Sequence, residues 1–203
     1  MNYLMLNGKR IDLTNEQVKE IQKGFDYCVI RLADIAVGDT FKIGGNEFVV
    51  LEHSKETTAV IMKGLLETSM KFGENNNFAD DNCTVRKRLV KFGSELEKIV
   101  GVNNLVRHTV DLTSDDGLKD YGKTQAKVSL LTCNQHRRYV EILDKHKLDA
   151  WWWLCTAFSA PTHDDKNFVK CVSPSGYINC RYYYDYGGVR PFCILNSNIF
   201  VSK

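Results

Sequence analysis

Two segments near the C-terminus, Trp151-Trp152-Trp153-Leu154 and Gly187-Gly188-Val189-Arg190-Pro191-Phe192, carry the strongest structural signal of this 203-residue chain. Tryptophan buries a large area, so at least one of the three is expected to fill a core. Side chains alternate between faces along a strand, so Trp152 should oppose its two neighbours. Arg190 and Pro191 are expected to be structural, because proline suits the start or edge of a strand and arginine pairs with acids or carbonyls.

A run rich in tyrosine, asparagine and arginine, residues 177–186, lies between these two segments. Large rigid aromatics beside small polar residues are typical of binding surfaces such as antibody loops. Five tyrosines cannot all be buried without partners for their hydroxyl groups, so some should be exposed. The predicted ligand-contact residues are Cys155, Phe158, His163, Tyr177, Asn179, Arg181, Tyr182, Tyr184 and Tyr186.

The N-terminal residues predict a small hairpin followed by a helix. Strands over residues 3–13 would be joined at Asn7-Gly8, which suits a type I′ turn. Thr14 and Gln17 form a capping box that would begin a helix over residues 15–23.

The rest of the chain predicts strands with two helices between them. Apolar residues recur at helical spacing over residues 85–100, before Gly101, and a second capping box at Thr132 and Gln135 would begin another helix. The expected strands are 40–43, 48–51, 59–62, 105–112, 150–156, 168–172, 177–183 and 189–195. This order predicts an α+β fold with a hairpin–helix extension over residues 1–34 and one domain over 35–203.

Composition narrows the class of protein. A net charge of +2 without a clustered basic face gives no case for nucleic acid. No run reaches the ~20 apolar residues of a membrane span, and the N-terminus lacks the features of a signal peptide. Seven cysteines without a CxxC pair favour reduced thiols, so the expected location is the cytoplasm or a phage particle.

The two C-terminal segments resemble a domain family of unknown function that occurs in gut bacteria and their prophages. Its signature is Trp-Trp-Leu-Arg-Ser/Thr-Pro followed later by Gly-Val-Arg-Pro, which matches residues 152–157 and 188–191 here. The resemblance spans most of residues 35–203 and implies a C-type-lectin-like fold, similar to the variable proteins of diversity-generating retroelements. Cys155 and Ala157 depart from the signature, where the family has arginine and proline.

Retroelement mutagenesis of adenines yields NNY codons, which exclude Trp, Lys, Gln, Glu and Met. Residues 155–165 and 177–186 contain none of these five. The C-terminal face is therefore a candidate for diversification, which would also account for Cys155 and Cys180.

No catalytic or metal-binding motif stands out. The set of Cys155, His163, Cys171 and Cys180 lacks the two close ligand pairs of a zinc site. Residues 111–120 are rich in aspartate, but they lack the glycine and glutamate of an EF-hand, so a polar turn is favoured. We therefore expect no enzyme activity, no cofactor and no metal.

The sequence predicts a non-enzymatic ligand-binding protein of phage or mobile-element origin that recognises a protein or a cell-surface ligand. One alternative is a phage-encoded inhibitor of a host defence or regulatory protein, with one fixed partner. A lower-ranked alternative is a cysteine-dependent oxidase related to formylglycine-generating enzymes. That activity would require Cys180 and Cys193, or another pair, to meet and bind copper.

Overall fold

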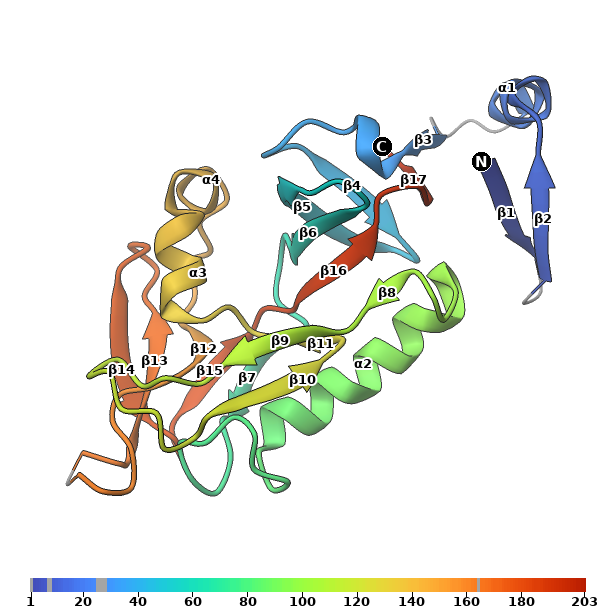
Figure 1. The fold of residues 1–203 in the computed structure, drawn as a ribbon. Coiled ribbons are helices and arrows are strands. Elements are labelled where there is room, and N and C mark those ends of the chain that lie inside the picture. The colour runs from blue at the N-terminus through green and yellow to red at the C-terminus, as the bar shows by residue number, and fades with distance from the viewer. Residues whose placement is uncertain (1, 7–8, 25–28, 164) are drawn as a thin grey trace. The chain divides into compact units, whose positions relative to one another are not determined.

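The computed structural model describes residues 2–6, 9–24, 29–163 and 165–203, and it is an α+β protein (Figure 1). The chain forms two compact units, each built from separate segments. Unit 1 comprises residues 1–63, 93–106 and 193–203, and unit 2 comprises residues 64–92 and 107–192. The predicted boundary at residue 34 stays a prediction.

The N-terminal elements follow the sequence prediction. Strand β1 (Asn2–Leu6) pairs antiparallel with β2 (Lys9–Leu13), and the predicted Asn7-Gly8 turn lies outside the described residues. Helix α1 (Asn15–Gly24) begins with the predicted capping box. The Thr14 amide donates to Gln17 Oε1 at 2.9 Å, and the Gln17 amide donates to Thr14 Oγ1 at 3.2 Å.

Unit 1 is built around an antiparallel meander. Strands β4 (Thr40–Ile43), β5 (Asn46–His53) and β6 (Thr57–Met62) pair in sequence order, as predicted. The order continues as β16-β6-β5-β4-β17-β3, with β8 on β16. The added strands are β3 (Val29–Arg31), β8 (Leu105–Val106), β16 (Phe192–Asn196) and β17 (Phe200–Ser202).

Unit 2 contains a five-stranded mixed sheet in the order β14-β13-β12-β15-β7. Its strands are β7 (Glu67–Lys71), β12 (Trp152–Ala157), β13 (Phe168–Val172), β14 (Ile178–Tyr182) and β15 (Tyr186–Val189). The β12–β15 pair is parallel and the other pairs are antiparallel. Strand β14 therefore forms one edge of this sheet.

Helices α2, α3 and α4 and the short strands β9, β10 and β11 are the other main elements of the described residues. Helix α2 (Thr84–Val100) runs through Gly93, and Gly101 follows it with a φ of 90°. Helices α3 (Cys133–Arg138) and α4 (Val140–Lys145) follow the predicted second capping box, and α3 packs against β12 (Figure 1). Strands β9 (His108–Asp111) and β10 (Lys123–Ala126) form a separate hairpin, and β11 spans Val128–Ser129. None of the described helices has the length and apolar character that crossing a bilayer requires.

The tryptophan and glycine segments meet in the core of unit 2. Trp152 and Trp153 are 2 % and 0 % exposed, so the predicted core role of tryptophan is confirmed. The Trp153 indole donates to the Met70 carbonyl at 2.9 Å and packs edge-on against Phe72. A Cβ atom on Gly187 would lie 2.8 Å from the Trp153 ring, so glycine gives the indole its space.

Trp152 points to the other side of the sheet, as strand alternation predicts. Its ring lies 5.8 Å from His136 of α3 and 5.2 Å from the Arg190 guanidinium. Arg190 is 1 % exposed and donates to the His146 carbonyl at 3.1 Å. Arg190 is therefore buried and bonded to the backbone, in agreement with the structural role expected for it.

Candidate functional site

Three aromatic residues stack on one another at one end of the β13–β14 hairpin. Phe168 stands opposite Tyr182 in the strand register, and their rings lie 4.2 Å apart. Tyr184 folds back over Tyr182, with ring centroids 4.9 Å apart and planes 10° from parallel. We call Phe168, Tyr182 and Tyr184 the tyrosine stack. Its two tyrosines are 39 % and 47 % exposed.

A tight turn after β14 holds the tyrosine stack in shape. The Asp185 amide donates to the Tyr182 carbonyl at 2.9 Å, and the Tyr182 amide donates to the Asp185 carboxylate at 3.2 Å. Tyr183 is anchored on both sides, because its amide donates to the Asn167 carbonyl and its carbonyl accepts from the Phe72 amide, each at 3.0 Å. The exposed rings are thus ordered before any ligand arrives, which lowers the entropic cost of binding.

A cavity of about 430 Å³ lies beside the tyrosine stack. We call it the asparagine pocket. It is lined by Asn75, Asn76, Asn77, Asp80, Tyr121, Pro161, Lys166, Asn167 and Tyr183. The Tyr183 ring meets the Tyr184 ring edge to face at 5.2 Å, so the pocket and the stack form one continuous surface.

Asn76 ties together the loops that form this pocket. Its side chain is 1 % exposed, and its amide nitrogen donates to the Ser159 carbonyl at 2.8 Å and the Phe168 carbonyl at 3.2 Å. Its amide oxygen accepts from the Tyr121 hydroxyl. Burial, and then the charges of Asp120 and Asp80, raise the pKa of Tyr121 to about 12. The phenol is therefore neutral at physiological pH and can donate this hydrogen bond.

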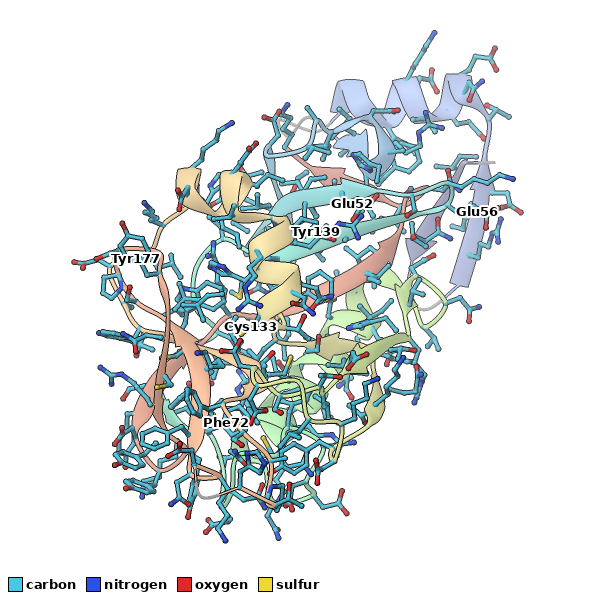
Figure 2. The ribbon with its side chains drawn as sticks, turned by 60° about the vertical axis from the view of Figure 1, so that its left-hand side comes forward. Glu52, Glu56, Phe72, Cys133, Tyr139 and Tyr177 are labelled. Atoms are coloured by element: carbon cyan, nitrogen blue, oxygen red, sulfur yellow. The ribbon has the colours of Figure 1, made fainter. Side chains whose placement is uncertain are left out.

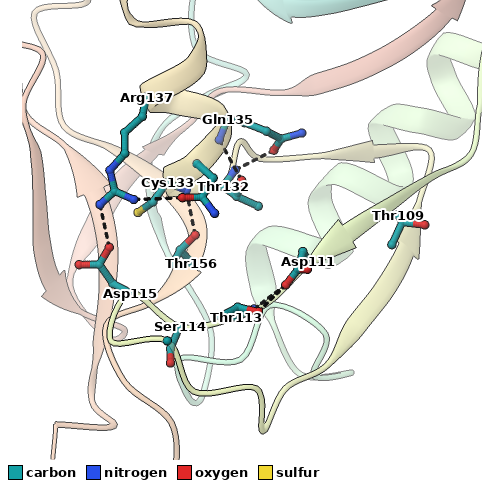
Figure 3. Close-up of a pocket in the computed structure, with 12 residues that line it drawn as sticks. Thr109, Asp111, Thr113, Ser114, Asp115, Thr132, Cys133, Gln135, Arg137 and Thr156 are labelled. Atoms are coloured by element: carbon teal, nitrogen blue, oxygen red, sulfur yellow. Dashed lines mark hydrogen bonds and ion pairs between the residues drawn. The ribbon is translucent and has the colours of Figure 1, made fainter.

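A second cavity of about 410 Å³ lies between the β9 strand, the following loop and the start of α3 (Figure 3). We call it the threonine pocket. It is lined by Thr109, Asp111, Thr113, Ser114, Asp115, Gly117, Thr132, Cys133, Asn134, Gln135, Arg137 and Thr156. Its walls are polar, and many of their groups already bond each other. The Cys133 amide, for example, donates to Thr156 Oγ1 at 2.9 Å.

An ion-pair network joins the threonine pocket to the aromatic residues. The Asp115 carboxylate accepts from Arg137 at 3.0 Å and lies 3.0 Å from the Lys170 ammonium. Burial opposes the ionisation of Asp115, but hydrogen bonds from Lys170 and Arg137 outweigh it and hold its pKa below the usual value. Lys170 is 8 % exposed and lies over the Phe158 ring at 5.2 Å, and Phe158 packs on Phe168.

The structure brings together only part of the predicted contact set. Phe158, Tyr182 and Tyr184 belong to one aromatic group, and exposed His163 lies 3.6 Å from Asp116. Tyr177 is 75 % exposed, but it lies in the turn at the opposite end of the β13–β14 hairpin and points away from the ribbon (Figure 2).

Three predicted residues lie on other parts of the β13–β14 region. Arg181 lies on the opposite face of β14 from Tyr182, with its guanidinium 4.4 Å from the Trp151 ring centroid, and it donates to the Tyr186 carbonyl at 3.1 Å. Tyr186 is 57 % exposed and its ring faces Lys71 at 5.7 Å. Asn179 uses its amide oxygen to accept from the Cys180 amide at 2.8 Å on the sheet edge.

Cys155 requires a correction, because its side chain does not reach the surface. It is 1 % exposed, and its thiol donates to the Leu130 carbonyl at 3.0 Å. Burial raises the pKa of this thiol. A residue enclosed in this way cannot contact a ligand on the surface, so we leave Cys155 out of the contact set.

The six cysteines of the described residues are free thiols, of which Cys180 is half-buried and the other five are buried. Burial raises the pKa of Cys83 and Cys133 to about 11, and that of Cys171 and Cys193 to about 12. Thiols with raised pKa values are poor nucleophiles at neutral pH. Within the described ranges, no three His, Cys, Asp or Glu side chains are grouped as a metal site would require.

Sequence reasoning missed the residues that line the asparagine pocket. Residues 75–77 match no functional motif, and neither do Tyr121 and Asn167. Three consecutive asparagines are a usable signal, because asparagine side chains hydrogen-bond backbone amides two residues ahead. Here the Asn77 amide donates to Asn75 Oδ1 at 2.8 Å, and the Ala79 amide donates to Asn77 Oδ1 at 2.9 Å.

No protein-family model matches this chain, and neither a curated protein nor a solved structure matches it.

Proposed function

We propose that this chain is a non-enzymatic binding protein that contacts a protein or a cell-surface ligand through the tyrosine stack and the asparagine pocket. The observation that carries the proposal is the stacking of Tyr182 on Tyr184 while both rings remain well exposed. Exposed aromatics that are held rigid beside polar loops supply large contact area at low entropic cost, and tyrosine is enriched at binding hot spots.

The thiol chemistry favours this binding role over the oxidase alternative. A cysteine-dependent oxidase would need reactive thiolates, and burial raises the pKa of Cys193 to about 12. The free energy needed to ionise such a thiol at neutral pH works against that chemistry.

The C-type-lectin-like fold, the phage or mobile-element origin and a location in the cytoplasm or on a phage particle belong to the same proposal. Their support is the resemblance of residues 152–157 and 188–191 to the family signature. The packing of Trp152 on Arg190 and of Trp153 on Gly187 is consistent with a shared framework role for these motif residues.

A display experiment tests the binding role. Immobilised wild-type protein would be used to select binders from a library of displayed host-protein fragments, and each binder would be retested on the Tyr182→Ala/Tyr184→Ala variant. We expect binding to fall at least about tenfold, because hot-spot truncation costs about 2 kcal/mol or more. The melting temperature should change little, since both rings lie on the surface.

Tyr177→Ala is the matched control, because Tyr177 is more exposed but lies at the other end of β14. Fragments that lose affinity for the double variant should bind Tyr177→Ala as tightly as wild type. If the double variant retains the full set of binders, the tyrosine stack is not the contact surface and the proposal is wrong.

A further inference from the structure

The asparagine pocket presents aromatic rings and a fixed carboxylate to the same open space. Tyr121 and Tyr183 both line it, together with Asp80. The Asp80 carboxylate is held by the Asn75 amide at 2.9 Å and the Asn82 backbone amide at 2.7 Å. These two bonds, led by that from Asn75, lower the pKa of Asp80. The pocket therefore holds an ionised carboxylate whose position is set before binding.

The loops that frame the pocket are acidic, although the chain as a whole has a net charge of +2. Their described residues are 74–82, 119–122, 161–163, 165–167 and 183–185, which contain six Asp or Glu residues against two lysines. Two cations of α2 lie next to these loops: Arg86 donates to the Ala79 carbonyl and lies 3.7 Å from Asp81, and the charges of Lys87 and Arg86 contribute to the lowered pKa of Asp80. Six carboxylates still outnumber these two cations and the two lysines of the loops. A surface of one sign attracts and orients a partner of the opposite sign.

Aromatic rings elsewhere in unit 2 already hold cations of the chain. Arg181 lies 4.4 Å from the Trp151 ring centroid, Lys170 lies 5.2 Å from that of Phe158, and Lys71 lies 5.7 Å from that of Tyr186. Such contacts are favourable because the face of an aromatic ring carries negative potential. Tyr121 and Tyr183 offer the same chemistry beside Asp80, in a cavity large enough for a long side chain.

We propose that the asparagine pocket binds a lysine or arginine side chain from a basic segment of a protein partner. This inference rests on the proposed binding function and names the chemistry of its ligand. The carboxylate of Asp80 would pair with the cation, and the rings of Tyr121 and Tyr183 would contact its charged end and aliphatic stem. Lys166 also lines the pocket and opposes a cation, so it reduces the affinity.

The test measures binding of a fluorescent ten-residue peptide of alternating glycine and arginine to the full chain, by anisotropy. The matched peptide carries glutamine in place of arginine. We expect the arginine peptide to bind at least tenfold more tightly, with an affinity that falls as salt rises, because screening weakens exposed charge pairs. Equal binding of the two peptides would overturn the proposal.

Variants of the pocket give predictions of opposite sign. Asp80→Asn should weaken binding of the arginine peptide, and Lys166→Gln should strengthen it. Tyr183→Leu should weaken it roughly 2- to 5-fold, as expected for loss of one exposed cation–π contact. If Asp80→Asn proves unstable, Lys166→Gln and Tyr183→Leu test the pocket on their own, since both residues line it.

Asp144→Asn is the matched control, because it removes one negative charge from α4 without altering the pocket lining. If it weakens binding as much as Asp80→Asn does, the attraction is non-specific and the inference fails. The inference would also be overturned by displayed fragments that bind the tyrosine stack but contain no basic residues. Such fragments would bind Asp80→Asn as tightly as wild type. They would leave the proposed function intact.

Discussion

Gly187 lets strand β15 pack directly against the Trp153 indole. A Cβ atom there would lie 2.8 Å from Cε2 and 2.9 Å from Nε1 of Trp153, which is itself fully buried. Gly187→Ala must therefore move either the indole or the β15 backbone. We expect a loss of about 1–3 kcal/mol in the free energy of unfolding, measured by urea denaturation, as for other overpacked cores.

Gly64→Ala is the control for this prediction. Nothing lies within 4 Å of a Cβ atom on Gly64, and its φ is not in the left-handed region. The free energy of unfolding should stay within about 0.5 kcal/mol of wild type, as at other unconstrained surface positions. Similar effects of the two substitutions would contradict the proposed crowding at Trp153.

His136 gives the fold a pH dependence of its own. Burial, and then the positive charge of Arg190, lower its pKa from 6.5 to about 4. Between these values the unfolded chain binds the proton and the folded chain does not, so stability falls as the pH drops from 6.5 to 4. With allowance for solvent screening, the loss attributable to His136 should be about 2 kcal/mol.

The measurement compares the free energy of unfolding at pH 7 and pH 4.5 for wild type and His136→Gln. The variant cannot bind the proton, so its stability should fall less over this range. His163→Gln is the control, because His163 is exposed, with its side chain 58 % accessible. The same acid loss in wild type and His136→Gln would rule out this assignment.

At the scale of elements, strand β14 is an open edge whose backbone donors are covered by side chains. The Cys180 amide donates to Asn179 Oδ1 at 2.8 Å, and the Tyr182 amide donates to Asp185 Oδ2 at 3.2 Å. Open edges invite pairing with another chain, and natural proteins block them with local devices. Asn179 and Asp185 therefore protect this edge of the sheet.

Replacing both caps should promote self-association. We expect Asn179→Ala/Asp185→Ala to bind a second copy roughly thirtyfold more tightly than wild type, since each of the two freed amides adds about 1 kcal/mol when paired. Light scattering after gel filtration would measure this over a range of concentrations. Asp149→Ala controls for the lost charge on an exposed residue outside β14. An unchanged mass for the double variant would show that these caps do not guard the edge.

Local sequence signals predicted most of the elements. Both capping boxes and the 40–62 meander are confirmed, because turn and cap chemistry depends on residues within a few positions. Three elements were wrong in their extent. The expected strand 105–112 is split into β8 and β9, and the expected strand 189–195 into β15 and β16 around Arg190-Pro191. The helix after Thr132 is interrupted at Tyr139, which has a φ of −103°.

The candidate site was predictable only in part, because its walls come from distant segments. The tyrosines stood out by composition, but Tyr184 reaches Tyr182 because the turn after β14 folds it back, which strand alternation does not predict. The pocket beside them depends on Asn76 bonding to the Ser159 carbonyl, 83 residues away in the chain. Cys155 was misplaced because a strand buried on both faces has no alternating pattern to reveal it.

At the scale of the whole molecule, each unit is assembled from segments that are far apart in the sequence. The tyrosine stack, the asparagine pocket and the threonine pocket all belong to unit 2, and β12 lies in the centre of its sheet. Rigid strands thus carry the framework, while loops and one edge strand carry the candidate contacts, as in other binding scaffolds.

This division predicts where the gene can vary if a retroelement diversifies it. Substitutions in the source population should concentrate at half-buried Phe158 and at the exposed positions His163, Tyr177, Asn179, Tyr182, Tyr184 and Tyr186. Buried Trp152 and Trp153 and close-packed Gly187 should not vary, because changing them costs core packing. Cys155 should also stay fixed or apolar, although its codon lies inside the NNY-compatible stretch. Deep sequencing of the 3′ end of the gene measures this, and equal variation at buried and exposed positions, or none at all, would contradict a diversified face.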